Sequence, residues 1–147
     1  MLCEYRVMVG GGPTISFNDT AVGITPGKWL TDLFTRNMGV RWAEFVVSSS
    51  VKLRADAALK IGMIDEEAAD KADAIAKCKK FIKMFDDVPQ EARINTKRAI
   101  REQYLNELKI HREQYVQNFL NSIKTARSQE ILEQYIQLIK QRKKNTL

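Results

Sequence analysis

Two different apolar patterns meet at Asn18-Asp19-Thr20-Ala21-Val22-Gly23-Ile24, and Trp29 follows shortly afterwards. Before this segment apolar and polar residues alternate, which is typical of strands, whereas after it apolar residues recur at helical spacing. Asp19 is the one carboxylate in this polar turn. A carboxylate between a strand and a helix can act as a general base, or it can cap the turn as an idle hydrogen-bond acceptor.

The size and composition of the chain indicate a single globular domain. It has 147 residues, of which 44% are hydrophobic and 29% are charged, so neither disorder nor a disulfide scaffold is indicated. Cys3 and Cys78 lie far apart in sequence, and such a pair gives no metal-ligand spacing. No apolar run approaches the roughly 20 residues of a transmembrane segment, and no transit peptide is recognised at the beginning of the chain.

The net charge of +6 is concentrated in the last third of the chain. A basic helical end is compatible with nucleic acid, an anionic membrane or a phosphorylated ligand, and equally with a solvated surface. Because aromatic residues do not alternate with the basic ones, no nucleic acid partner is expected.

Short extended segments and helices share the first part of the chain. Strand-like patterns cover residues 4–9 and 14–17, and a brief extended piece is expected at 63–64. Helices are expected from Pro26 to a stop at Gly39, then over 41–47, and then over 55–60. The aromatic residues on the first two of these helices are predicted to be core: Trp29, Phe34, Trp42 and Phe45.

The rest of the chain is predicted to be almost entirely helical. One helix is expected over residues 67–85, two over 92–104 and 105–123 that could be continuous, and a last one capped by Ser128. Two or three short strands cannot form a stable sheet alone. We therefore predict that residues 1–66 are part of a larger sheet-containing core and that 67–147 form a helical region, together one incomplete domain.

Several motifs in order along the chain carry a family resemblance. They are Phe17-Asn18-Asp19-Thr20-x-x-Gly23-Ile24, Asp56-x-Ala58-Leu59-Lys60-x-Gly62-x-Ile64-Asp65-Glu66 and Ala92-Arg93-x-x-Thr96-Lys97. With these motifs the chain resembles the crotonase (enoyl-CoA hydratase/isomerase) superfamily, in particular the C-terminal half of the mitochondrial Δ3,Δ2-enoyl-CoA isomerases. The resemblance implies an α+β or α/β fold: the C-terminal part of a crotonase-like spiral, with two or three short strands, followed by a mostly helical region.

The resemblance also implies a reaction. Members of this family move a double bond in fatty acyl-CoA, from 3-enoyl-CoA to trans-2-enoyl-CoA, which lets unsaturated fatty acids enter β-oxidation. One carboxylate shuttles the proton, and two backbone N–H groups hold the thioester oxygen. No metal or bound cofactor is needed, since coenzyme A is part of the substrate. Asp19 matches the catalytic position, and the implied substrate-binding residues are Asn18, Thr20, Ile24, Trp29, Phe119 and Lys124.

Three departures from the family pattern stand beside this resemblance. The half of the family fold that precedes the matched region, which carries both oxyanion donors, has no counterpart in the chain. Asp19 replaces the family's Glu and loses about 1.5 Å of reach, which can cost on the order of 100-fold in rate. Ser50 stands where the family usually has Gly.

These departures leave two function classes open. In the first class the chain is an acyl-CoA isomerase, or an inactive fragment or paralogue of one. In the second class it is a non-catalytic structural or interaction subunit of an assembly. The resemblance implies a homotrimer or other oligomer formed through the C-terminal helices. It also implies the mitochondrial matrix, with the peroxisome as the alternative.

Overall fold

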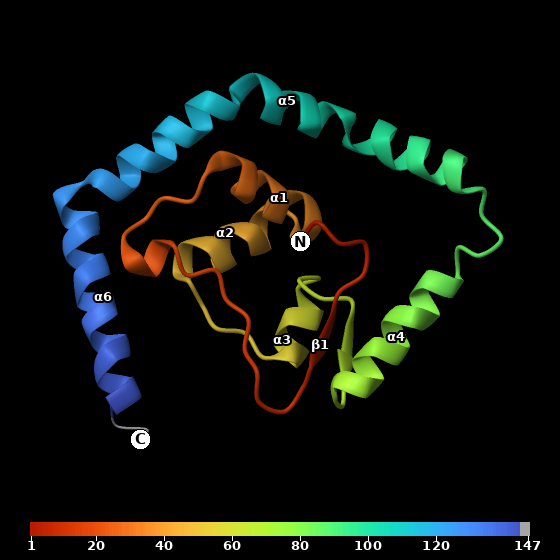
Figure 1. The fold of residues 1–147 in the computed structure, drawn as a ribbon, viewed down its shortest axis with the longest axis horizontal. Helices are drawn as coiled ribbons and strands as arrows, with labels where there is room; N and C mark the ends of the chain where they lie inside the picture. Colours follow the sequence, from red (N-terminus) through yellow and green to blue (C-terminus); the bar gives the residue numbers. More distant parts are fainter. Residues whose placement is uncertain (145–147) are drawn as a thin grey trace.

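A computed structural model describes residues 1–144, with side chains through residue 141. In chain order the elements are β1 (Val7–Val9), the 3₁₀ helix η1 (Thr20–Val22), α1 (Lys28–Met38), α2 (Val40–Ser49), α3 (Ala55–Lys60), β2 (Glu66–Ala68), α4 (Lys71–Lys83), α5 (Gln90–Lys124) and α6 (Ala126–Lys144). Figure 1 shows α1, α2 and α3 gathered with the N-terminal segment into a small body, and α4, α5 and α6 lying around its outside.

Local signals set the bounds of the three inner helices. Gly39 has a φ of 77° and stands between α1 and α2, ending one helix and beginning the next. This is a backbone conformation that glycine adopts without a steric penalty. The helix predicted over 55–60 has the predicted bounds in α3. Gly62, with a φ of 73°, follows it and turns the chain toward β2.

The sheet consists of β1 and β2 paired in parallel, in the register Val7 to Glu66 and Val9 to Ala68. The strand predicted over 14–17 is wrong, because this segment makes only an isolated antiparallel bridge from Ile15 to Leu53. The extended piece predicted at 63–64 also lies elsewhere, since the strand begins at Glu66. β2 runs across the predicted boundary between residues 66 and 67, and that division of the chain stays a prediction.

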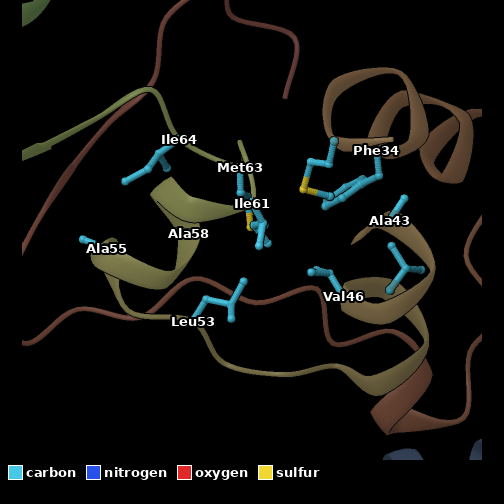
Figure 2. Packing of buried hydrophobic residues seen from close by; sticks show 11 residues of the cluster. Phe34, Ala43, Val46, Leu53, Ala55, Ala58, Ile61, Met63 and Ile64 are labelled. Atoms are coloured by element: carbon cyan, nitrogen blue, oxygen red, sulfur yellow. The ribbon is translucent and has the colours of Figure 1, made fainter. Parts of the chain in front are cut away.

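One cluster of buried side chains forms the core of the body. Figure 2 shows Met63 and Ile61 between α3 and the side chains of α1 and α2, with Ala55 and Ile64 on the opposite side of α3. Val46 on α2 is fully buried. Ala58 on α3 is also 0% exposed.

The predicted aromatic core is wrong for three of its four residues. Phe34 is buried, but Trp29, Trp42 and Phe45 are 40%, 37% and 48% exposed. Trp42 and Phe45 instead pack edge to face against each other, with ring centroids 6.2 Å apart. Helical spacing identifies the apolar face of a helix, but whether that face is covered depends on elements distant in sequence.

The outer helices also depart from the predicted limits. The helix expected from residue 67 begins later, because β2 occupies 66–68 and Asp70 caps α4 by accepting the N–H of Asp73 at 2.8 Å. The two helices expected over 92–123 are the single continuous helix α5. Ser128 is not the cap of the last helix. That role belongs to Thr125, whose hydroxyl accepts the Ser128 N–H at 3.1 Å.

We call α5 and α6 together the arch. Among the described side chains of α5, only Tyr104 is buried, although a helix of this length usually buries an apolar stripe. Polar contacts join α5 to the body. The Tyr104 hydroxyl donates to the carbonyl of Trp29 at 3.0 Å, and Arg93 pairs with Glu4 at 2.7 Å.

The accessible surface is large for the mass of the chain. It amounts to 10704 Å² for 16.9 kDa, whereas a compact monomer of this mass exposes roughly 7,700 Å². The excess includes large apolar side chains along both arch helices, among them Ile110 at 76% and Leu138 at 53% exposed. None of the helices within residues 1–144 is long and apolar enough to cross a membrane.

Two valines on α2 provide a matched test of the core. Val46→Ala is expected to lower the free energy of unfolding by about 2 kcal/mol, because it removes two buried carbons and leaves a cavity. Val40→Ala, on the same helix but 69% exposed, is expected to change it by less than about 0.5 kcal/mol. Urea unfolding followed by circular dichroism measures both, and equal effects of the two substitutions would contradict the position of this core.

Candidate active site

The backbone of the turn at Asp19 is closed by its own hydrogen bonds. Asp19 has helical φ and ψ angles of −57° and −47° and immediately precedes η1. Its carbonyl accepts the N–H groups of Val22 at 3.1 Å and Ile24 at 2.9 Å. Gly23 ends η1 with a φ of 74°. The carboxylate makes no capping hydrogen bond, so Asp19 does not cap η1 through its side chain.

The surroundings of the Asp19 carboxyl group raise its affinity for a proton. Asp19 is half-buried, and this burial raises its pKa above the ordinary value of 3.8. Burial is the one resolved cause, and no cation within the described residues lowers the pKa in opposition. A carboxylate with a raised pKa and no fixed hydrogen-bond partner is a suitable general base, since its lone pairs are free and its basicity is increased.

Hydrogen bonds to α2 and α6 hold the turn from two sides. The Thr20 hydroxyl donates to the carbonyl of Val47 at 2.8 Å, and the N–H of Ala21 donates to the Ser50 hydroxyl at 3.0 Å. On the other side, the Ser128 hydroxyl donates to the carbonyl of Gly23 at 2.6 Å. Ser128, predicted only as a cap, therefore fixes α6 against the turn that contains Asp19.

A cleft of about 480 Å³ lies beside the turn, between α1 and α2. Its lining combines threonines with apolar side chains: Thr20, Ile24, Thr25, Pro26, Thr31, Thr35, Val40, Ala43, Glu44, Val47 and Ser48. Two of the predicted substrate-binding residues, Thr20 and Ile24, thus line one cleft. Asp19 is adjacent in sequence but does not line it, and Asn18 is exposed.

A second, more apolar groove of about 520 Å³ lies between Trp29 and α5. It is lined by Trp29, Leu108, Lys109, Arg112, Tyr115, Val116, Phe119 and Leu120. The structure therefore brings together Trp29 and Phe119, which are far apart in sequence. Lys124 is exposed at the end of α5 and lines neither cavity.

Sequence reasoning missed the other α5 residues of this groove. Leu108, Arg112, Tyr115 and Phe119 recur at helical spacing, which places them on one face of α5. That periodicity was available as a signal, but nothing in the sequence indicates that this face lies against Trp29.

Comparison with known proteins identifies the class to which this fold and turn belong. The family model "Enoyl-CoA hydratase/isomerase" matches residues 1–144. The chain belongs to the enoyl-CoA hydratase/isomerase family, as the motifs predicted. The predicted fold class, a partial crotonase-like α+β fold followed by a helical region, is also confirmed.

Individual relatives show which members of this family the chain resembles. The chain is 29% identical over 145 residues to "Enoyl-CoA delta isomerase 1, mitochondrial" of Mus musculus, covering 97% of this chain and 50% of the relative. It is 30% identical over 110 residues to "Ethylmalonyl-CoA decarboxylase" of Homo sapiens, covering 71% and 36%.

Among solved structures, human mitochondrial delta3-delta2-enoyl-CoA isomerase superposes with a TM-score of 0.88 at 27% identity, over 96% of this chain and 55% of that one. The chain thus spans about half the length of the curated delta isomerase and about a third of the decarboxylase.

The raised pKa of Asp19 leads to a prediction about stability. Because the folded chain binds this proton more tightly than the unfolded chain does, ionisation costs stability as the pH rises above 3.8 through the folded-state pKa. Asp19→Asn removes that cost. The variant is therefore expected to be more stable than the wild type at pH 7, and equal to it well below pH 3.8. Urea unfolding at a series of pH values measures the difference, and a variant less stable at pH 7 would contradict the burial of this carboxyl group.

Proposed function

We propose that this chain carries the proton-transfer part of an acyl-CoA double-bond isomerase. In this proposal Asp19 removes a proton from one carbon of a 3-enoyl-CoA and returns it to another, giving the trans-2-enoyl-CoA. The observation that carries the proposal is the Asp19 carboxylate itself, which is half-buried, free of capping hydrogen bonds and raised in pKa. One base on the correct face of a delocalised enolate can serve both carbons.

The two cavities support the proposed substrate class. A fatty acyl chain requires an apolar channel, and the groove between Trp29 and Phe119 has an apolar lining. Lys109 and Arg112 belong to the same lining, and their positive charge is complementary to the phosphates of coenzyme A. Thr20 and Ile24 line the neighbouring cleft. Contacts of Asn18 and Lys124 with the substrate remain predictions.

The proposed reaction needs an oxyanion hole in addition to the base. The family resemblance assigns its two N–H donors to the half of the fold that the matched region does not cover. The loss of one such donor costs about 3–4 kcal/mol of barrier. We therefore propose that Asp19 reaches full activity only when these donors are supplied beside it.

An isomerisation assay with a 3-enoyl-CoA tests the role of Asp19. Asp19→Asn is expected to lower kcat/KM by about 10²- to 10⁴-fold, because it removes the base. Asp19→Glu is expected to raise it, by up to about 100-fold, because it restores the reach of the family's side chain.

The matched control for these substitutions is Asp32→Asn. Asp32 pairs with Lys28 on the surface of α1 at 2.7 Å, and a surface ion pair of this kind contributes little to stability. Its removal is expected to leave the rate unchanged. If Asp19→Asn and Asp32→Asn had the same activity as the wild type, Asp19 would not be the proton shuttle.

The second candidate function, a non-catalytic interaction subunit, is favoured by the exposed apolar surface. On α6 the exposed apolar side chains Tyr135, Leu138 and Ile139 recur at helical spacing, and an unpartnered stripe of this kind is typical of an interface. The two candidates share a proposed homotrimer or other oligomer formed through the arch helices. We also propose the mitochondrial matrix as the location, with the peroxisome as the alternative.

Light scattering after size-exclusion chromatography tests the oligomer. The wild type is expected to have a mass that is a multiple of 16.9 kDa, and Leu138→Asp is expected to shift it toward the monomer, because a charge would be buried in the interface. The control is Ile82→Asp on α4, where the side chain is 64% exposed and lies outside the arch. A monomeric wild type, or equal shifts for both variants, would contradict an interface on α6.

A further inference from the structure

Ser50 has an unusual backbone conformation next to the Asp19 turn. It follows α2 with φ and ψ angles of 52° and 29°, and it is the one residue other than glycine with a positive φ among the described residues. This left-handed region is unfavourable for residues with a Cβ atom, and glycine is the residue that usually ends a helix this way. A serine at this position has a conformational cost that glycine would not have. The presence of its side chain therefore requires an explanation.

The Ser50 hydroxyl accepts one particular hydrogen bond. Its Oγ lies 3.0 Å from the N atom of Ala21. The N–H groups of Val22 and of Gly23, the residue after η1, find acceptors inside the turn, but the first N–H groups of a helix have none of their own. Ser50 supplies that acceptor for Ala21 from outside the turn.

A second hydrogen bond makes the attachment directional. The Thr20 hydroxyl donates to the carbonyl of Val47 at 2.8 Å, so consecutive residues of η1 are bound to the last turn of α2. Two bonds prevent a rotation that one alone would allow. Asp19, whose carbonyl closes the same turn, is therefore held in a fixed orientation relative to α2.

We propose that Ser50 is a positioning residue for Asp19, an inference that rests on the proposed role of Asp19 as the base. An aspartate has one torsion fewer than a glutamate with which to correct an error in the position of its backbone. A rotation of η1 therefore displaces the carboxylate by nearly the same amount as the backbone. A misplacement of about 1 Å can cost about 10²-fold in rate. The hydroxyl of Ser50 removes that freedom.

Substitutions at Ser50 separate positioning from simple helix capping. Ser50→Gly accepts the positive φ without penalty but removes the acceptor, so the chain is expected to unfold at an equal or higher urea concentration. Amide hydrogen exchange at Ala21 is nevertheless expected to become about tenfold faster. The pKa of Asp19, measured by carboxyl ¹³C NMR, is expected to fall toward 3.8 as the carboxylate becomes more hydrated.

Two further variants complete the test. Ser50→Asn is expected to behave as the wild type, since asparagine tolerates the left-handed region and offers a side-chain acceptor. Ser49→Ala is the control, because the Ser49 hydroxyl donates to the carbonyl of Phe45 within α2 itself. It is expected to leave Ala21 exchange and the pKa of Asp19 unchanged.

The readouts also distinguish this inference from the proposed function. In the isomerisation assay, Ser50→Gly is expected to lower kcat about tenfold at an unchanged KM. If Ser50→Gly left both Ala21 exchange and the pKa of Asp19 at their wild-type values, the positioning role would be overturned, whatever the assay gave. If both changed while Asp19→Asn kept full activity, Ser50 would still position Asp19, and the assignment of Asp19 as base would be the part that fails.

Discussion

The pairing of β1 with β2 is the contact on which the rest of the fold depends. Parallel strands cannot be joined by a tight turn and require a long crossover. Here the crossover contains η1, α1, α2 and α3. The Arg6 side chain and backbone N–H both bind the Asp65 carboxylate, at 2.9 and 2.8 Å, just before the paired residues. A charge-assisted pair of this geometry helps to fix the register of a sheet with only two short strands.

Elements whose ends are marked by local chemistry could be predicted from the sequence. α3 has its predicted bounds, and Gly39 ends α1 where expected. The failures lie where a distant partner decides the outcome. Residues 14–17 alternate like a strand but form only one bridge, from Ile15 to Leu53, and three aromatic residues expected in the core lie at the surface. Sequence periodicity indicates which face of an element is apolar, and tertiary contacts decide whether that face is buried.

At the candidate site, too, local features could be predicted from the sequence and contacts with distant residues could not. The identity of Asp19 and its place in a polar turn could be predicted, as could the family. The free state of its carboxylate could not, because an aspartate before a short helix is usually a cap. The hydrogen bonds that Thr20 and Ser128 donate and that Ser50 accepts, all with partners distant in sequence, could not be predicted either, since a hydroxyl side chain can pair with almost any backbone group.

The unbroken course of α5 has a mechanical consequence. A helix of 35 residues follows a path about 50 Å long, and Figure 1 shows that α5 bends around the body along this path. Near its start, Arg93 forms an ion pair with Glu4 in the segment before β1. Just beyond its end, the Ser128 hydroxyl on α6 donates to the carbonyl of Gly23 in the turn after Asp19. Because α5 is one continuous helix, it connects these two contacts over its whole length. The separation between the sheet and the turn at Asp19 therefore depends in part on the length of α5, and one residue inserted into α5 would rotate its two ends relative to each other by about 100°.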